Sequence, residues 1–329
     1  MKKFINSVET LLDESLHGFA QAHHDIVQFN EAPRYLSRVT PGRPGKVAQI
    51  SGGGSGHEPL HLGFVGQGML DAACPGQVFT SPTPDQMLAA AQAVESGGGV
   101  LFIVKNYAGD VMNFEIAAEM LECPHDSLLI HDDVSIPEHQ GMGRRGVAGT
   151  TLVEKIVGAA AEEGYDLVAC KTLGERVVHA TASMGVALTS CTVPALGRPT
   201  FDIADNEMEV GVGIHGEKGR ERVALASASE IVERLAGIIE EELKPAPGQP
   251  ILLHVNGLGG TPLMELYLLY HLAEQYFSGR GVTIARSLVG NFTTSLDMAG
   301  ASITVTLLDE ELTRLWDAPV HTAALRWGC

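Results

Sequence analysis

The distribution of hydrophobic and polar positions along the chain predicts strands that alternate with helices. Short apolar runs bounded by glycine or polar residues predict strands at 46–50, 100–104, 127–131, 251–255, 282–288 and 302–308. Apolar residues spaced three or four positions apart predict helices at 8–16, 85–95, 113–122, 151–163 and 263–277, and segment 167–189 is expected to be mainly helical. This alternation predicts an α/β fold with largely parallel pairing.

The length of 329 residues suggests two domains, each with a sizeable core. We expect an N-terminal α/β domain over 1–185 and a C-terminal α/β domain over 186–329, with mixed, largely parallel sheets. Ligands of such folds bind beyond the carboxyl ends of the strands, where the chain carries its glycine-rich loops.

A run of glycines follows the first predicted sheet strand, where segment 52–57 reads Gly-Gly-Gly-Ser-Gly-His. Glycines let the backbone approach a polar ligand and offer amide donors. The spacing fits neither a Walker A loop nor a dinucleotide fingerprint, since Pro59 occupies the third glycine position of the latter. His57 favours a functional site because imidazole exchanges a proton near neutral pH. The alternative is a tight strand-to-helix turn with an incidental histidine.

Two other segments carry candidate chemistry. Lys105 and Asp110 follow an apolar strand and suit hydroxyl binding and proton transfer, although a surface ion pair and a helix N-cap explain them equally well. His215 stands between two glycines, close to Glu217, a carboxylate that can orient the ring and raise its basicity. The alternative for His215 is an exposed turn histidine.

Two further carboxylates, Asp132 and Asp133, lack a third acidic partner, so we expect a capping or hydrogen-bonding role for them. The thirteen histidines form no His-Glu-x-x-His pair, and we therefore expect no bound metal.

The amino-acid composition argues against a nucleic-acid-binding protein and against a membrane-spanning one. A formal charge of −18 argues against nucleic-acid binding, because phosphates would be repelled. The five cysteines are scattered without a Cys-x-x-Cys spacing, which is typical of reduced thiols in the cytoplasm. Acidic residues interrupt segment 4–20, and no apolar run approaches the ~18 residues needed to span a bilayer. We expect a soluble, cytoplasmic protein with no membrane partner.

The motifs, taken in order, resemble the dihydroxyacetone kinase family, specifically its K subunit. The matching segments are 51–59 (SGGGSGHEP), 74–76 (CPG) with 79–85 (FTSPTPD), 105–110 (KNYAGD), 143–146 (GRRG), 205–209 (DNEME) with 211–217 (GVGIHGE), 295–298 (SLDM) and 315–322 (LWDAPVHT). They extend over essentially the whole chain.

The resemblance implies roles for particular residues. His215 would form a hemiaminal with the carbonyl carbon of dihydroxyacetone, which selects ketones and aldehydes over glycerol. His57 and Asp110 would assist the hydroxyl that attacks the γ-phosphate, with Asp110 as the proton acceptor. The substrate hydroxyls would be held by the glycine-rich loop and the lysine, that is, by Gly54, Ser55, Gly56 and Lys105.

The resemblance also implies partners. The chain lacks the Gly-Asp-Gly-Asp-type carboxylate cluster of the family's nucleotide-binding subunit, so it would bind no cofactor itself. Mg²⁺ and ADP or ATP would belong to a separate L-type subunit, with an M-type phosphoryl donor as a further possible partner, and K subunits are usually homodimers. A free-standing K chain favours phosphoenolpyruvate as the donor, whereas the compact segment 217–251 leaves direct use of ATP open. Two alternatives remain: a non-catalytic, ketose-sensing co-activator, and a kinase subunit for a related ketose such as erythrulose.

Overall fold

A computed structural model describes residues 2–137 and 141–329, and the chain divides into two compact units whose segments alternate along the sequence. Unit 1 comprises Met1–Ile130, Thr150–Arg176 and Arg314–Cys329, and unit 2 comprises His131–Gly149 and Val177–Thr313. We expected contiguous domains, 1–185 and 186–329. The units differ from that division because two later segments of the chain return to unit 1 and pack with its first 130 residues.

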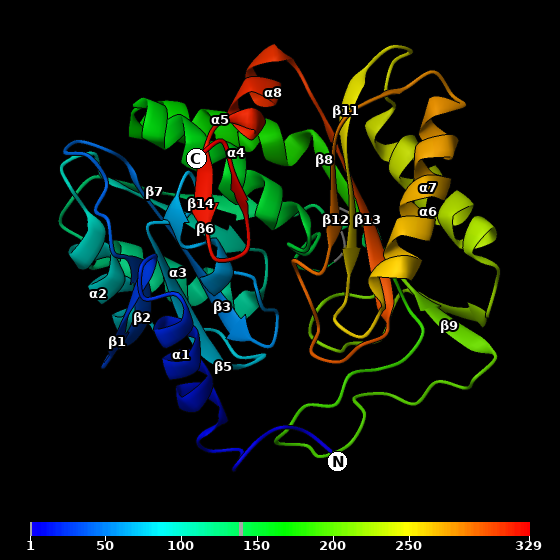
Figure 1. Cartoon of the computed structure of the whole chain (residues 1–329), viewed down its shortest axis with the longest axis horizontal. Coiled ribbons are helices and arrows are strands. Elements are labelled where there is room, and N and C mark those ends of the chain that lie inside the picture. The colour runs from blue at the N-terminus through cyan, green and yellow to red at the C-terminus, as the bar shows by residue number, and fades with distance from the viewer. Residues whose placement is uncertain (1, 138–140) are drawn as a thin grey trace. The chain divides into compact units, whose positions relative to one another are not determined.

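The main sheet of unit 1 has the strand order β1-β2-β5-β3-β6-β7 among the described residues (Figure 1). Its strands are β1 (Val27–Glu31), β2 (Arg34–Arg38), β3 (Ala48–Ser55), β5 (Ala72–Val78), β6 (Val100–Lys105) and β7 (His125–Ile130). The strands β5, β3, β6 and β7 pair in parallel, whereas β1 and β2 extend the sheet in antiparallel orientation. The parallel pairing brings the carboxyl ends of β3 and β6 side by side.

Helices and a small sheet complete unit 1. The helices are α1 (Leu11–Ala22), α2 (Pro84–Val94), α3 (Ala108–Glu119), α4 (Gly149–Glu163) and α5 (Leu167–His179), with a short 3-10 turn η1 (Leu62–Phe64). The helix α8 (Glu310–Asp317) crosses the boundary between the units, which falls after Thr313. Apolar residues of α2 and α3 pack against β3, β5 and β6 and form the core of this unit. The small sheet joins β4 (Gly66–Gln67) to β14 (Val320–Thr322) and β15 (Arg326–Trp327), so the last segment of the chain pairs with an early one.

Unit 2 contains a sheet of strand order β10-β9-β8-β13-β11-β12 within the described part of the chain. Its strands are β8 (Thr181–Ala187), β9 (Glu207–Val210), β10 (Glu221–Ala224), β11 (Pro250–Gly257), β12 (Thr283–Gly290) and β13 (Gly300–Leu307). Here β11 and β12 pair in parallel, and the other neighbouring pairs are antiparallel.

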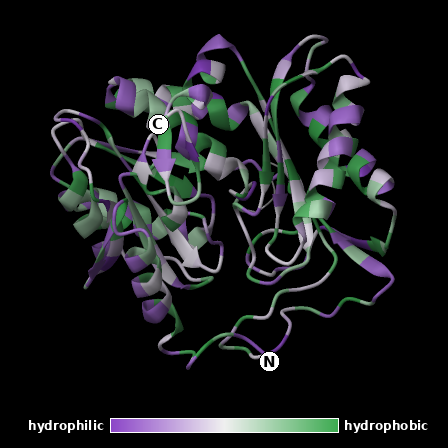
Figure 2. Ribbon diagram, viewed as in Figure 1, coloured by the Kyte–Doolittle hydropathy of each residue, from purple (hydrophilic) through white to green (hydrophobic). Residues whose placement is uncertain are grey.

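Two helices, α6 (Ala228–Leu243) and α7 (Leu263–Ser278), pack on this second sheet. Polar and apolar residues alternate along both helices in Figure 2. The helix α6 is amphipathic with one buried face, whereas α7 also exposes large apolar side chains such as Met264 and Tyr267. The helix α6 begins with a capping box, in which the Ser227 hydroxyl accepts from the Glu230 N–H and the Glu230 carboxylate accepts from Ser227.

The α/β class and the mixed sheets are confirmed, and two local predictions need correction. The glycines at 52–54 were expected in a loop, but they belong to β3, which continues to Ser55 because β5 pairs with it along this length. Segment 167–189 was expected to be mainly helical, yet it turns at the end of α5 and continues as β8, where β13 supplies an antiparallel partner. In both cases pairing with a neighbouring strand overrides a weak local signal.

Candidate active site

Lys105 ends β6 in unit 1 and is fully buried. Its Nζ donates to the carbonyl oxygen of Gly52 at 3.0 Å and lies 2.8 Å from Nε2 of His61. The carboxylate Oδ2 of Asp110 is 3.4 Å from the same nitrogen, and this side chain is also buried. The structure therefore brings Lys105 and Asp110 together as an interior ion pair. Two alternative interpretations are therefore wrong. Lys105 does not form a surface ion pair, and the N-cap of α3 is Tyr107 rather than Asp110.

The glycines of β3 allow this close packing. A Cβ atom on Gly53 would lie 2.3 Å from Lys105 Nζ, so only glycine admits the ammonium group at this position. A Cβ atom on Gly54 would lie 2.5 Å from the backbone nitrogen of Thr80. The glycine run is thus needed for packing within unit 1, whatever ligand it also approaches.

The next two residues, Ser55 and Gly56, form hydrogen bonds to other groups of unit 1. The Ser55 hydroxyl donates to the carbonyl oxygen of Gly76 at 2.8 Å. The Gly56 N–H donates to the Glu58 carboxylate at 2.9 Å, and Gly56 has a φ of +106°, which favours glycine. A role for Ser55 and Gly56 in substrate binding stays a prediction.

His57 follows this loop and is fully buried. Its ring stacks on Phe79 with 5.1 Å between the ring centroids and 20° between the ring planes. Phe79 directly follows β5, so the strands β3 and β5 together fix the orientation of the imidazole.

A second histidine of unit 1, His61, was missed by the sequence reasoning. Its Nδ1 lies 2.6 Å from Oε1 of Glu154 on α4, and both side chains are buried. Burial lowers the pKa of His61 well below its usual value, and the charges of Lys105 and His57 act in the same direction. Burial also raises the pKa of Glu154 well above its usual value, although the positive charge of Lys105 opposes this shift. We conclude that the His61 ring is neutral.

Unit 2 positions His215 through the main chain. The carboxylate Oε2 of Glu217 accepts from the His215 N–H at 2.8 Å, and Oε1 accepts from Nη1 of Arg145 at 2.8 Å. We expected this carboxylate to orient the imidazole. Its hydrogen bond is instead with the backbone of His215, because Arg145 holds the carboxylate from the other side.

Arg145 is the centre of this second cluster and comes from the Gly-Arg-Arg-Gly motif. Besides Glu217 it binds the Asp133 carboxylate at 2.6 Å, the Ser135 hydroxyl at 3.0 Å and the carbonyl oxygen of Gly211 at 2.9 Å. Burial raises the pKa of Asp133, and the guanidinium opposes that rise. One side chain therefore joins the segment 133–135 to the segment 211–217, which contains His215.

Asp132 has the structural role expected of it. Its carboxylate accepts from the backbone N–H groups of Val147 at 2.8 Å and Gly149 at 2.7 Å, and Gly149 begins α4. This is a hydrogen-bonding role at a helix start.

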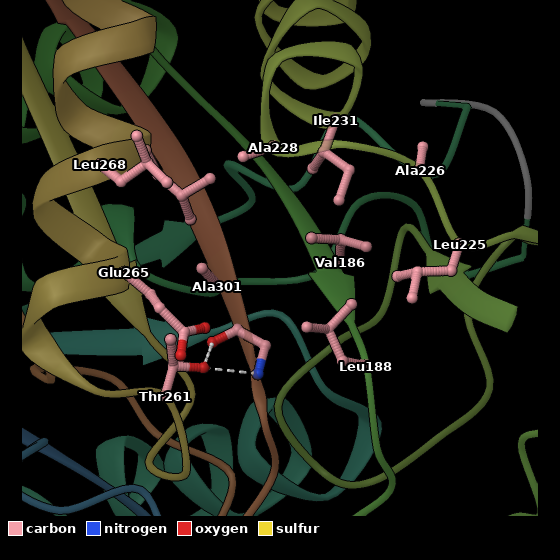
Figure 3. Close-up of a pocket in the computed structure, with 12 residues that line it drawn as sticks. Val186, Leu188, Leu225, Ala226, Ala228, Ile231, Thr261, Glu265, Leu268 and Ala301 are labelled. Atoms are coloured by element: carbon pink, nitrogen blue, oxygen red, sulfur yellow. Dashed lines mark hydrogen bonds between the residues drawn. The ribbon is translucent and has the colours of Figure 1, made fainter. Parts of the chain in front are cut away.

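An apolar pocket of about 180 Å³ lies in unit 2 between the sheet and its helices (Figure 3). Its walls include Val186 on β8, Ile231 on α6 and Leu268 on α7, with Glu265 as a carboxylate at one side. None of the predicted site residues lines it. Among residues 2–137 and 141–329 we find no group of three or more His, Cys, Asp or Glu side chains placed to hold a metal ion. In the same residues no helix is long and apolar enough to cross a membrane.

The family model described as the Dak1 domain matches residues 17–324. The chain belongs to this family. A Dak1 relative from Escherichia coli (strain K12), the dihydroxyacetone-binding subunit DhaK of a PEP-dependent dihydroxyacetone kinase, is 47% identical over the full length of both chains. The resemblance that the motifs predicted is thereby confirmed.

Two solved Dak1 structures have the same fold. A dihydroxyacetone kinase operon co-activator superposes with a TM-score of 0.90 at 33% identity, covering 94% of this chain and 97% of that one. The dihydroxyacetone kinase of C. freundii superposes with a TM-score of 0.87 at 35% identity, covering 98% of this chain and 60% of that one. The fold thus occurs both in a kinase and in a co-activator.

Proposed function

We propose that this Dak1 chain is the dihydroxyacetone-binding, catalytic subunit of a dihydroxyacetone kinase, which phosphorylates dihydroxyacetone to dihydroxyacetone phosphate. The observation that carries the proposal is the buried pair of Lys105 and Asp110, with His57 fixed in the same unit. A buried ion pair costs desolvation energy and adds little stability, so its presence beside a strand end favours a chemical role. The full-length identity of 47% to a dihydroxyacetone-binding kinase subunit supports the same function.

In the proposed mechanism a ring nitrogen of His215 attacks the substrate carbonyl carbon. One N–C bond forms, the C=O π electrons move to oxygen, and that oxygen takes up the proton released by the ring, so the hemiaminal contains all atoms of the ketone. The link anchors a substrate with few atoms to grip and supplies the positioning on which phosphoryl transfer depends. Glu217 supports this step because it holds the backbone of His215 in place.

Asp110 then accepts the proton of the substrate hydroxyl that attacks the phosphoryl group, and His57 donates a hydrogen bond to the reacting oxygen. Lys105 keeps a positive charge beside the carboxylate, at 3.4 Å. Gly54, Ser55 and Gly56 hold the substrate hydroxyls through their backbone. A separate L-type subunit carries Mg²⁺ and the nucleotide, and an M-type subunit that delivers phosphate from phosphoenolpyruvate is the favoured donor. We also propose that the subunit is a cytoplasmic homodimer.

The second candidate function is a ketose-sensing co-activator, and the TM-score of 0.90 to an operon co-activator favours it. Such a protein needs the ketone adduct but no proton acceptor. Asp110 and His57 therefore favour the kinase, and a third option is a kinase whose substrate is erythrulose.

The adduct is tested with dihydroxyacetone labelled with ¹³C at the carbonyl carbon. We expect the ¹³C signal to move from a ketone to a tetrahedral position on binding, and native mass spectrometry to show addition of one intact ketone. His215→Asn should abolish both signals, whereas His24→Asn, at an exposed position, should retain them. A tetrahedral adduct that survives in His215→Asn contradicts the covalent assignment.

Catalysis is tested with the purified L-type subunit and either ATP or the phosphoenolpyruvate-linked donor. Wild type should turn over dihydroxyacetone faster than erythrulose, and Asp110→Asn should form the adduct without turnover. An adduct without turnover in the wild type would identify the protein as a sensor.

A further inference from the structure

His61 and Glu154 have no part in the mechanism above, yet they form a buried chain that ends on Lys105. The atoms lie in the order Glu154 Oε1, His61 Nδ1, His61 Nε2 and Lys105 Nζ, with separations of 2.6 Å at the first contact and 2.8 Å at the last. All three side chains are fully or nearly fully buried. Removing these polar groups from water is costly, so every hydrogen in the chain needs an acceptor.

Each of the three ammonium hydrogens of Lys105 has an acceptor nearby. An ammonium group has three hydrogens and no lone pair. One is donated to the Gly52 carbonyl oxygen at 3.0 Å and one lies on the line to His61 Nε2 at 2.8 Å. The third is left for Asp110, whose carboxylate oxygen is 3.4 Å away. The first two contacts therefore decide the direction in which the third hydrogen points.

This arrangement determines the tautomer of His61. Because the ammonium can only donate, Nε2 of the neutral ring must be the acceptor, and the ring hydrogen must be on Nδ1. At 2.6 Å from Nδ1, Oε1 of Glu154 is placed to accept that hydrogen. In the opposite tautomer two N–H groups would face each other at Lys105, and Nδ1 would lose its donor role toward the carboxylate.

We propose that Glu154 acts together with the Lys105 contact to hold His61 as the Nδ1–H tautomer, and that it fixes the ring in the orientation that directs the Lys105 ammonium toward Asp110. His61 and Glu154 are positioning residues, since neither acts on the substrate except through Lys105. The importance of this tautomer for turnover rests on the proposed function, in which Asp110 receives the hydroxyl proton. The tautomer itself is a property of the resting protein and does not depend on that function.

Two further observations support the proposal. The absence of a side chain at Gly53 lets the ammonium lie directly against β3, since a Cβ atom there would be 2.3 Å from Nζ. Burial and the charges of Lys105 and His57 lower the pKa of His61, which keeps the ring uncharged and its Nε2 lone pair available. The helix α4 is buried along nearly its whole length, so solvent does not replace Glu154 as the acceptor.

The first test is ¹⁵N NMR of the histidine rings in the full-length protein without substrate. The His61 signals are identified by their loss in His61→Gln. Wild type should show the neutral ring with hydrogen on Nδ1, and Glu154→Gln should show the same tautomer, because the amide oxygen can replace the carboxylate as acceptor. In Glu154→Met the Nδ1 signal should move, because its hydrogen loses the carboxylate acceptor while Lys105 still donates to Nε2. An unchanged Nδ1 signal in this variant overturns Glu154 as that acceptor. A wild-type ring with hydrogen on Nε2, or an imidazolium, overturns the proposal.

The second test separates positioning from binding in the reconstituted kinase. We expect Glu154→Met to lower kcat by roughly 10- to 100-fold, by analogy with the loss of the hydrogen-bond partner of a metal-ligating histidine. The KM for dihydroxyacetone and the ¹³C adduct at His215 should stay close to wild type, and Glu154→Gln should recover most of kcat. Wild-type kcat in a folded Glu154→Met variant overturns the positioning role. If the wild type binds the ketone without turnover, the proposed kinase function fails, while the NMR result still decides the tautomer.

Discussion

Glu217 joins Arg145 at 2.8 Å through one carboxylate oxygen and holds the backbone N–H of His215 at 2.8 Å through the other. The same guanidinium binds Asp133, whose side chain is almost completely buried. The Glu217 carboxylate thus holds the backbone of His215, the residue proposed to bind the ketone, and Arg145 holds that carboxylate in place. A Cβ atom on Gly213 would lie 1.8 Å from the Glu217 carboxylate, so the loop is fitted closely around this contact.

Arg145→Ala should destabilise the protein by about 3–5 kcal/mol, because it leaves the buried Asp133 carboxylate without its cation. It should also weaken formation of the His215 adduct, since Glu217 loses the partner that holds it. Urea unfolding and the ¹³C adduct signal measure the two effects.

The neighbouring Arg144 is the matched control. It forms an ion pair with Glu242 at 2.7 Å in which the glutamate is exposed and the arginine is partly exposed, and surface pairs contribute about 0–1 kcal/mol. Arg144→Ala should therefore leave the adduct unchanged. Equal losses in the two variants would show that Arg145 has no special role.

Gly53→Ala should lower kcat strongly, because the added methyl group takes the space of the Lys105 ammonium and separates it from Gly52 and His61. Gly18→Ala in α1 is the control, since nothing lies within 4 Å of the added atom. That change should stabilise the helix by about 0.5–1 kcal/mol and leave activity intact. Kinetics and thermal unfolding on both variants check the prediction, and a fully active Gly53→Ala enzyme would contradict it.

Phe79→Leu should reduce kcat, because His57 loses the flat ring that fixes its imidazole. An aromatic pair is worth about 0.5–1.5 kcal/mol beyond its buried area, which sets the scale of the effect. Phe79→Tyr should retain activity, since Phe79 is partly exposed and an added hydroxyl can reach water. Similar rates for the leucine and tyrosine variants would argue that the stacking is incidental.

Stability should fall as the pH is lowered from about 6.5 to about 4, in part through His254. Burial lowers the pKa of this imidazole from 6.5 to about 4, and its Nδ1 lies 3.0 Å from the Leu288 carbonyl oxygen. In this range the unfolded chain binds a proton that the folded chain does not, so acid favours unfolding. The full pKa shift of His254 corresponds to a loss of about 3 kcal/mol in the free energy of unfolding.

Replacement by an uncharged residue removes this contribution. Urea unfolding of His254→Asn at several pH values should show a smaller loss of stability between pH 6.5 and 4 than the wild type shows. Parallel pH profiles of the two proteins would exclude His254 as a source of the acid sensitivity.

The sequence predicted well those elements whose pattern is strong over many residues. The apolar run of β6 and the spacing of α7 are examples, and both appear within one residue of the expected bounds. The strand β8 was missed because Thr-Ala-Ser-Met-Gly-Val-Ala has neither clear alternation nor branched residues throughout. It is a strand because β13 and β9 pair with it.

The site was predictable where its residues lie in local motifs and not where a contact joins distant segments. His57, Lys105 and Asp110 could be named from the residues around them. His61 and Glu154 are 93 positions apart, so no local pattern links them. A signal did exist, since Glu154 and Lys155 interrupt the otherwise apolar segment 152–161 in the middle of α4. Buried charges in such a segment need partners.

The alternation of the two units along the chain has a consequence for synthesis on the ribosome. Unit 1 receives the segment Arg314–Cys329 only after the segments of unit 2 have been synthesised, and β14 within it pairs with β4, about 250 residues earlier. Unit 2 is complete in sequence before that point, because its segments end at Thr313. The pairing of β4 with β14 can therefore form only after all of unit 2 has been synthesised, so the completion of unit 1 does not follow the usual N-to-C order of domain folding.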